Sequence, residues 1–116
     1  ALTDAEWDAT LAVNLHAAFV LAQRLAPAMI ARGWGRIINV TSQQAHRAYG
    51  NSGAYGVAKA GLTQLTRAQA EAWSRHGIAC NAIAPGVVET PLTRAVFADP
   101  GRAAAMAART FVGRNG

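Results

Sequence analysis

Cysteine is almost absent from this chain, since Cys80 is the only one among 116 residues. A single thiol cannot form a disulfide within the chain or build a cysteine-based metal cage, and we expect no metal site. The chain shows no secretory signal, and Asn14, His16 and Arg24 interrupt its longest apolar stretch. We therefore expect a cytoplasmic protein that does not cross a membrane.

Charge is also scarce, because only 15% of the residues are charged while 52% are hydrophobic. This composition favours a compact domain with a well-filled core over a disordered segment. The net charge of +5 comes from arginines that are scattered along the chain and form no run. A nucleic-acid-binding protein more often gathers its basic residues on one stripe, so we expect no nucleic-acid partner.

Lysine is rarer still, since Lys59 is the only lysine among the eleven Lys and Arg residues. It follows Tyr55 by four residues, a spacing that places both side chains on one face of a helix. A neighbouring ammonium favours the phenolate and lowers the pKa of a tyrosine from its usual value of about 10. The pair therefore predicts proton-transfer chemistry at Tyr55. Tyr49 is no equivalent, because Gly53 stands where its lysine would be needed.

The pattern of apolar residues predicts the order helix, strand, helix, strand. Residues 3–6 have the spacing of a capping box and open a long helix. The β-branched run 36–41 predicts a buried strand, residues 54–76 a second helix, and residues 78–84 a second buried strand. Beyond Pro85, helical pieces are expected, with breaks at Pro91 and Asp99-Pro100.

Each helix has an expected inward face. In the first it comprises Trp7, Leu11, Leu15, Ala18, Phe19, Ala22 and Leu25; in the second it comprises Val57, Ala58, Gly61, Leu62, Leu65, Ala68, Ala72 and Trp73. Gly77 is the expected stop of the second helix.

This alternation predicts an α/β fold, with a parallel, doubly wound sheet and helices packed on its faces. We expect residues 1–116 to form one domain or part of one. The chain opens with Ala1 at the edge of a helix and stops at Gly116 after a turn-like sequence. Both ends look cut, so we expect a fragment of a longer protein.

Three signals fall on one edge of the expected sheet, where ligands of open α/β proteins bind. Ser42 follows the first strand, Tyr55 opens the following helix, and Pro85-Gly86 follow the second strand. Each has a simpler explanation, because Ser42 and Pro85-Gly86 could be ordinary turn residues. Their convergence favours a catalytic site.

These motifs together identify a resemblance to a known family. Asn39-Val40-Thr41-Ser42, followed by Tyr55-x-x-x-Lys59 with the serine thirteen residues before the tyrosine, resembles the short-chain dehydrogenase/reductases. The segment 85–90, Pro-Gly-Val-Val-Glu-Thr, is similar to the family's Pro-Gly segment beside the nicotinamide, and Val13-Asn14-Leu15 resembles its helix asparagine. The resemblance covers essentially the whole chain, and each motif stands in the family's order.

The resemblance implies four catalytic residues. Tyr55 would be the general acid/base that exchanges a proton with the substrate oxygen during hydride transfer. Lys59 would tune Tyr55 and hold the ribose hydroxyls of the cofactor. Ser42 would hydrogen-bond the substrate oxygen. Asn14 would anchor a water that links Lys59 to solvent.

The resemblance also implies NAD or NADP as the cofactor. Tyr55 and Lys59 would contact it together with Pro85, Gly86, Val88 and Thr90, of which the Val88 backbone and the Thr90 hydroxyl would hold the carboxamide. The family's phosphate-binding glycine loop has no counterpart here, because Gly33-Trp34-Gly35 follows a helix and precedes a strand. We therefore expect the 116-residue chain alone to be inactive.

The expected activity is the interconversion of a secondary alcohol and a ketone. The polar stretches 43–47 and 49–52 suit a sugar acid or polyol, as in a gluconate dehydrogenase. A 3-oxoacyl thioester reductase and a non-catalytic regulatory protein of the same fold stay open as alternatives. His46 could contact substrate, while His16 and His76 are expected to be ordinary helix residues. By the resemblance, the full-length protein would form a homodimer or homotetramer.

Overall fold

The computed structural model describes residues 2–50 and 52–116. Asn51, part of one polar stretch considered for substrate contact, and Ala1 lie outside the described residues. The chain divides into two compact units, one extending to Ala84 and the other running from Pro85 to Gly116.

The first unit opens with α1 (Asp4–Leu11), and Thr3 caps it as expected. The Thr3 hydroxyl accepts from the Glu6 N–H at 3.2 Å, and the Glu6 carboxylate accepts from the Thr3 N–H at 2.9 Å. These bonds satisfy backbone donors that a helix start leaves without partners. The Glu6 carboxylate accepts from the Thr3 N–H and also from the Thr3 hydroxyl at 2.9 Å, and these two bonds hold the pKa of Glu6 below its usual value.

A π-helical turn, η1 (Ala12–His16), joins α1 to α2 (Ala17–Ala31) without interrupting the helix. Pro27 is accommodated inside α2, and Gly33 follows the helix at a φ of 66°. The helix continues through Asn14, His16 and Arg24, in agreement with the long first helix that was predicted. Asp4–Ala31 is long and apolar enough to cross a membrane by length and composition, although core helices of water-soluble domains meet the same criteria.

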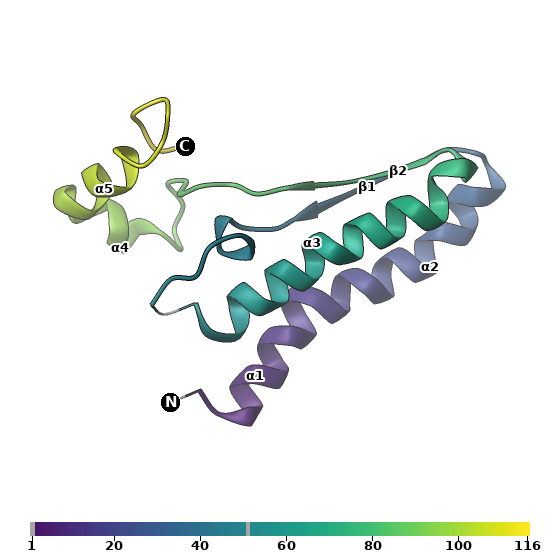
Figure 1. The fold of residues 1–116 in the computed structure, drawn as a ribbon, viewed down its shortest axis with the longest axis horizontal. Coiled ribbons are helices and arrows are strands. Elements are labelled where there is room, and N and C mark those ends of the chain that lie inside the picture. Colours follow the sequence, from purple (N-terminus) through teal and green to yellow (C-terminus); the bar gives the residue numbers. More distant parts are fainter. Residues whose placement is uncertain (1, 51) are drawn as a thin grey trace. The chain divides into compact units, whose positions relative to one another are not determined.

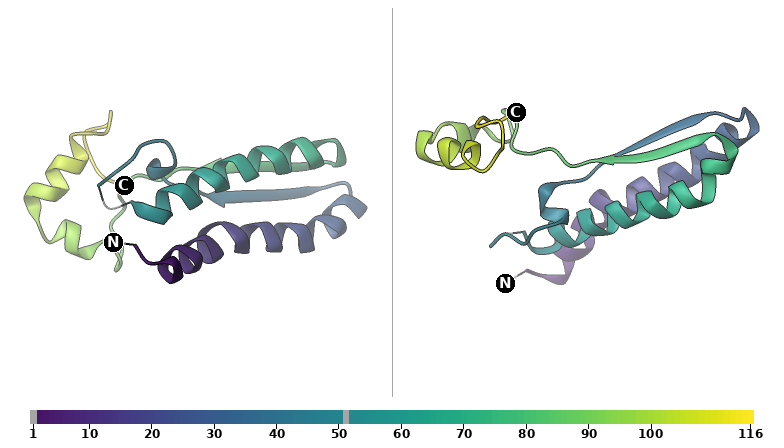
Figure 2. Two further views of the ribbon diagram at one scale, coloured as in Figure 1. Left: turned by 60° about the horizontal axis from the view of Figure 1, so that its bottom comes forward. Right: turned by 45° about the horizontal axis from the view of Figure 1, so that its top comes forward.

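Strands β1 (Gly35–Val40) and β2 (Ile78–Ile83) form a parallel two-stranded sheet, with Gly35 opposite Ile78 and Val40 opposite Ile83. Side chains alternate along a strand, so Gly35 and Asn39 face the same side. Gly35 lies against Met29 of α2, and Asn39 bonds Thr66 of the next helix. Both helices therefore cover one face of the sheet, as Figures 1 and 2 show.

The strands were expected to be buried, and this expectation is only half correct. Ile38 and Val40 of β1 are 63% and 52% exposed, and Ile83 of β2 is 50% exposed. These side chains point away from α2 and α3, and within the described residues up to Ala84 no helix covers that face. On the helix-covered face, Ile78 and Cys80 are buried, and burial raises the pKa of the Cys80 thiol.

Helix α3 (Gly53–Trp73) continues through a 3-10 turn, η3 (Ser74–His76), and ends at Gly77 with a φ of 78°, as expected. Its inward face is rotated from the expected one. Ala58 and Leu62 are buried, but Val57, Ala68 and Ala72 are exposed. Two polar residues, Thr66 and Gln69, take the inward positions instead.

A buried polar cluster explains this rotation. The Asn39 side-chain amide donates to the Thr66 hydroxyl at 2.9 Å and to Gln69 Oε1 at 3.0 Å. Thr66 in turn donates to the Leu62 carbonyl at 2.8 Å. Buried polar groups require such partners, so the strand and helix are oriented by hydrogen bonds as well as by apolar contact.

The first helix also buries less than expected. Ala22 and Ala26 of α2 belong to the core, whereas Trp7, Phe19 and Leu25 are more than a third exposed. The buried positions of α2 are thus taken by small side chains, and the bulkier apolar residues are exposed. The uncovered apolar residues give the helix Asp4–Ala31 an open hydrophobic side.

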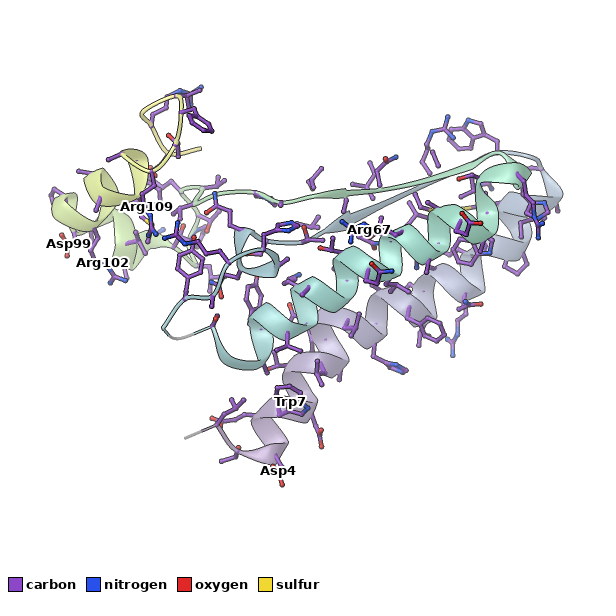
Figure 3. All side chains as sticks on the ribbon, in the orientation of Figure 1. Asp4, Trp7, Arg67, Asp99, Arg102 and Arg109 are labelled. Carbon is purple, nitrogen blue, oxygen red and sulfur yellow. The ribbon has the colours of Figure 1, made fainter. Side chains whose placement is uncertain are left out.

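The second unit contains α4 (Arg94–Phe97) and α5 (Pro100–Ala107), so the expected breaks are confirmed. Asp99 caps α5 by accepting from the Arg102 N–H at 3.1 Å; both residues are labelled in Figure 3. The chain end returns to the start of the unit, where Gly116 donates to the Val87 carbonyl at 3.1 Å.

Candidate active site

Tyr55 and Lys59 lie in the first two turns of α3, and the structure brings them together as their spacing predicts. The Lys59 ammonium nitrogen is 5.5 Å from the centre of the Tyr55 ring. It donates to the Val40 carbonyl at the end of β1 at 2.9 Å. Partial burial lowers the pKa of the Lys59 ammonium from its usual 10.5. An ammonium has three donors, so this bond leaves two for other acceptors.

Ser42 lies two residues beyond β1 and starts a 3-10 turn, η2 (Gln43–Ala45). Its hydroxyl accepts from the Gln44 N–H at 3.2 Å and keeps its own proton available for donation. This turn packs closely on α3 beside Tyr55, because a Cβ added at Gly56 would lie 3.2 Å from the Gln44 carbonyl. The segments that carry Ser42 and Tyr55 therefore meet at the carboxyl end of β1.

Asn14 lies inside the π-helical turn η1. Its side-chain amide donates to the Thr10 carbonyl at 3.1 Å. The next residue, Leu15, packs on α3 at Gly61, where an added Cβ would lie 2.9 Å from Leu15 Cδ2. Gly61 is two residues beyond Lys59, so η1 contacts α3 within one helical turn of Lys59 along the chain. A π-turn inside an α-helix is frequently found at functional sites.

The other expected cofactor residues belong to the second unit. All four residues, Pro85, Gly86, Val88 and Thr90, are exposed in a segment without regular structure. The Val88 carbonyl accepts from the Thr93 hydroxyl at 2.6 Å, and the Thr90 N–H donates to Thr93 Oγ1 at 2.9 Å. Thr93 was not among the predicted cofactor residues, although a second threonine three residues after Thr90 is visible in the sequence.

The remaining candidates lie elsewhere in the first unit. His46 lines a groove of about 390 Å³ with Gly53, Gly56 and Val57, and this groove does not include Ser42 or Tyr55. His16 lies near Phe19, with ring centres 6.2 Å apart. Among the described residues, no group of three or more His, Cys, Asp and Glu residues could hold a metal ion.

The donors and acceptors suit a ligand with vicinal hydroxyls and a primary amide. The two remaining Lys59 donors match ribose hydroxyls, which are good acceptors for a compact ammonium. In the second unit, Thr90 offers a hydroxyl on an exposed loop held by Thr93. Each set of donors and acceptors, taken by itself, is chemically compatible with one part of a nicotinamide nucleotide.

Comparison with known proteins gives consistent matches over most of the chain. The family described as Enoyl-(Acyl carrier protein) reductase matches residues 1–116. The gluconate 5-dehydrogenase of Gluconobacter oxydans is 35% identical over 111 residues, which are 96% of this chain and 43% of that protein. An acetoacetyl-CoA reductase of Allochromatium vinosum is 37% identical over 98 residues, which are 84% of this chain and 40% of that protein.

A solved structure shows the same fold. The gluconate 5-dehydrogenase of Burkholderia cenocepacia, in complex with NADP and tartrate, superposes with a TM-score of 0.93 at 39% identity. The match covers 100% of this chain and 46% of that one, so the chain spans less than half the length of these relatives. On this evidence the chain belongs to the short-chain dehydrogenase/reductases, a family of NAD(P)-dependent oxidoreductases with a Rossmann-like fold.

Proposed function

We propose that this chain carries the catalytic residues of an NAD(P)-dependent enzyme that interconverts a secondary alcohol and a ketone. The observation that carries the proposal is the position of the Lys59 ammonium, which lies 5.5 Å from the Tyr55 ring centre. This ammonium uses one N–H donor on the Val40 carbonyl and has two others for a ligand. A positive charge at that place favours the ionised phenol. Tyr55 can then take a proton from an alcohol, or return one to a ketone.

The cofactor supplies two-electron redox chemistry when NAD or NADP is bound. Tyr55 exchanges the proton at the substrate oxygen as general acid/base. Ser42 donates its hydroxyl proton to the same oxygen and stabilises the charge that develops there. Lys59 stabilises the Tyr55 phenolate, and Asn14 in the π-turn anchors a water through which Lys59 exchanges protons with solvent.

The proposed cofactor residues form two sets, one that contacts the ribose and one that contacts the carboxamide. Tyr55 and Lys59 hold the ribose hydroxyls. The Val88 backbone and the Thr90 hydroxyl hold the carboxamide, which orients the nicotinamide ring. Pro85 and Gly86 lead into this loop, and both are exposed.

Replacement of Tyr55 by Phe in the full-length protein tests the mechanism. We expect turnover to fall by at least about 100-fold, the lower end for loss of a general acid/base, while NADP binding changes little. Unchanged turnover would remove Tyr55 from the mechanism. If the unsubstituted protein binds cofactor but turns over no alcohol or ketone, a non-catalytic regulatory protein of this fold becomes the better explanation.

For the substrate, we propose a sugar acid or a polyol. The polar stretch from Gln43 to Arg47 follows Ser42, and gluconate 5-dehydrogenases are among the relatives. A 3-oxoacyl thioester is the second candidate, favoured by the acetoacetyl-CoA reductase relative. Rates of the full-length enzyme on gluconate, a polyol series and acetoacetyl-CoA separate the two, because kcat/KM should be highest on the class that the enzyme serves.

We also propose that the full-length protein is a cytoplasmic homodimer or homotetramer, and that no membrane or nucleic acid is its partner. The helix Asp4–Ala31 leaves Phe19 and Leu25 exposed, and an apolar groove of about 570 Å³ runs between this helix and Leu65 of α3. A second protein copy would remove these surfaces from water. Phe19→Asp should then lower the mass measured by light scattering, whereas recovery of the protein in a membrane fraction would contradict the proposal.

Finally, we propose that residues 1–116 are parts of one domain and that this chain alone has little activity. Tyr55 and Lys59 offer only the ribose contacts, and the chain has no glycine loop of the dinucleotide-binding kind. Calorimetric titration with NADPH should therefore give a dissociation constant weaker than micromolar for the 116-residue chain. Micromolar binding would contradict this.

A further inference from the structure

Two threonines on either side of Pro91 form a reciprocal hydrogen-bonded pair. The Thr90 N–H donates to Thr93 Oγ1 at 2.9 Å, and the Thr93 N–H donates to Thr90 Oγ1 at 3.3 Å. The two hydroxyl oxygens are 3.0 Å apart, and the Thr93 N–H also donates to the Thr90 carbonyl at 3.1 Å. Pro91 fixes the backbone between them, since its ring restricts φ. The turn is therefore held by backbone and side chains together.

The contacts of Thr93 determine where its hydroxyl proton lies. A hydroxyl has one donor and two acceptor positions. Thr93 Oγ1 is 2.6 Å from the Val88 carbonyl, which can only accept, and this is the shortest contact in the cluster. The Thr93 hydroxyl therefore donates its proton to the Val88 carbonyl. Its two acceptor positions are filled by the Thr90 N–H and by the Thr90 hydroxyl.

This arrangement fixes the proton of Thr90 as well. Because Thr93 has no proton left to give, Thr90 must be the donor between the two hydroxyls. One lone pair of Thr90 Oγ1 accepts from the Thr93 N–H. What Thr90 then offers to a ligand is the second lone pair and no proton, and Thr90 is exposed at the loop surface.

We propose that Thr93 is a positioning residue that makes Thr90 an obligate hydrogen-bond acceptor, and so selects the amide N–H₂ of the nicotinamide carboxamide. The inference rests on the proposed function, because it takes the ligand at Thr90 to be NAD or NADP. An ordinary threonine could donate to a ketone or carboxylate oxygen equally well. A threonine whose proton is already committed binds a ligand N–H and does not bind such an oxygen.

A pair of cofactors that differ at one group tests the proposal. Dissociation constants are measured by calorimetry on the full-length protein for NADP⁺ and for its 3-acetylpyridine analogue, in which a methyl group replaces the amide N–H₂. If the protein prefers NAD⁺, the corresponding NAD⁺ pair is used. Thr93→Val removes the hydroxyl with little change of shape, Thr93→Ser retains it, and Thr90→Val removes the acceptor itself.

We expect Thr93→Val to weaken NADP⁺ binding about threefold to tenfold, as for one neutral hydrogen bond, and to change binding of the analogue less than about twofold. Thr93→Ser should bind both like the unsubstituted protein, and Thr90→Val should resemble Thr93→Val. If Thr93→Val proves unstable, Thr93→Ala, in which water can reach the cluster, gives the same comparison.

Three results would overturn the inference. Equal weakening of both cofactors by Thr93→Val or Thr93→Ala would mean general support of the loop, and no change with either would mean that Thr93 has no role in binding. Both leave the proposed function intact. Failure of the unsubstituted protein to bind NADP⁺ or NAD⁺ would instead overturn the proposed function together with this inference.

Discussion

The two ends of the sheet differ in how they hold the chain. At the amino end, backbone meets backbone: Gly35 donates to the Gly77 carbonyl at 3.2 Å, and a Cβ at Gly77 would collide with the Gly33 carbonyl. At the carboxyl end, side chains add to the backbone bond from the Thr41 N–H to the Ile83 carbonyl at 2.7 Å. The Lys59 ammonium donates to the Val40 carbonyl, and the Thr41 hydroxyl donates to the Ile83 carbonyl at 2.8 Å.

Because of this difference, we expect the amino end of the sheet to contribute mainly to stability and the carboxyl end mainly to catalysis. Backbone contacts at the amino end leave no room for change and offer no reactive group. The carboxyl-end side chains retain hydrogen-bonding capacity, as Lys59 does with two remaining donors. Changes at the amino end should therefore unfold the protein, whereas changes at the carboxyl end should stop catalysis in a protein that stays folded.

The largest expected effect is the loss of activity in Lys59→Met of the full-length protein. Removal of the ammonium deprives Tyr55 of its stabilising charge, so we expect kcat/KM to fall about 10²- to 10⁴-fold. Arg67→Met on the same helix is the matched control, since Arg67, which is labelled in Figure 3, donates to its helix neighbour Gln64 at 3.2 Å. Steady-state kinetics should show less than about twofold change for this control.

Thermal unfolding of the Lys59→Met protein completes that comparison. Its stability should stay within about 1 kcal/mol of the unsubstituted protein, as for most partly exposed side chains. A large loss of stability with little loss of activity would mean that Lys59, at the carboxyl end of the sheet, serves the fold and not catalysis.

The next effect belongs to the amino end, in Gly77→Ala. An alanine at a φ of 78° is strained, and its Cβ would meet the Gly33 carbonyl. Gly33→Ala is the matched control, because Gly33 has a φ of 66° but nothing within 4 Å of an added Cβ. We expect about 1–2 kcal/mol of destabilisation from the strain alone in the control. Gly77→Ala should cost clearly more in urea unfolding, and equal costs would deny any role to the close approach.

A smaller effect is expected midway along the sheet, in Asn39→Ala. The substitution leaves the Thr66 and Gln69 side chains in the core without their partner, at a cost of about 1–3 kcal/mol. Asn81→Ala serves as control, since Asn81 is exposed on β2 and should change stability by less than about 0.5 kcal/mol. Equal effects in urea unfolding would show that the buried cluster contributes nothing to stability.

The smallest effect is a shift with pH. Burial lowers the pKa of Lys59 below 10.5, so the folded protein releases this proton more readily than the unfolded chain does. The penalty for burying the ammonium is present at neutral pH and is relieved as pH rises through the folded pKa toward 10.5. The alkaline limb of the kcat/KM profile should therefore begin below 10.5. A limb that begins only above pH 10.5 would mean that the Lys59 ammonium is fully exposed to water and that burial does not lower its pKa.

The order of elements, the Thr3 cap and the Gly77 stop could be predicted because each depends on local sequence. The contact of Lys59 with Tyr55 could also be predicted, since helical spacing alone brings them together. The roles of Asn14, Ser42, Tyr55 and Lys59 in catalysis stay predictions, as do those of Val88 and Thr90 in cofactor binding.

The orientation of α3 could not be predicted in the same way. Apolar periodicity assigned Val57, Ala68 and Ala72 to the core and left Thr66 and Gln69 outside. The structure reverses this because Asn39 on a distant strand supplies their hydrogen-bond partner. A polar side chain is buried when its partner lies opposite, and a linear pattern does not contain that partner. The Thr93 contacts could not be predicted either, because they join side chains to backbone across a turn.

The π-turn at Ala12–His16 has a consequence for how this helix tolerates length changes. A π-turn amounts to one additional residue in an α-helix, and one residue corresponds to about 100° of rotation. Because the widened turn takes up that extra residue, deletion of a single residue between Ala12 and His16 would restore a regular spiral and leave residues 4–11 and 17–31 facing nearly as they do now. Deletion of one residue elsewhere in the helix would instead rotate its capped start against the half that covers the sheet by about 100°.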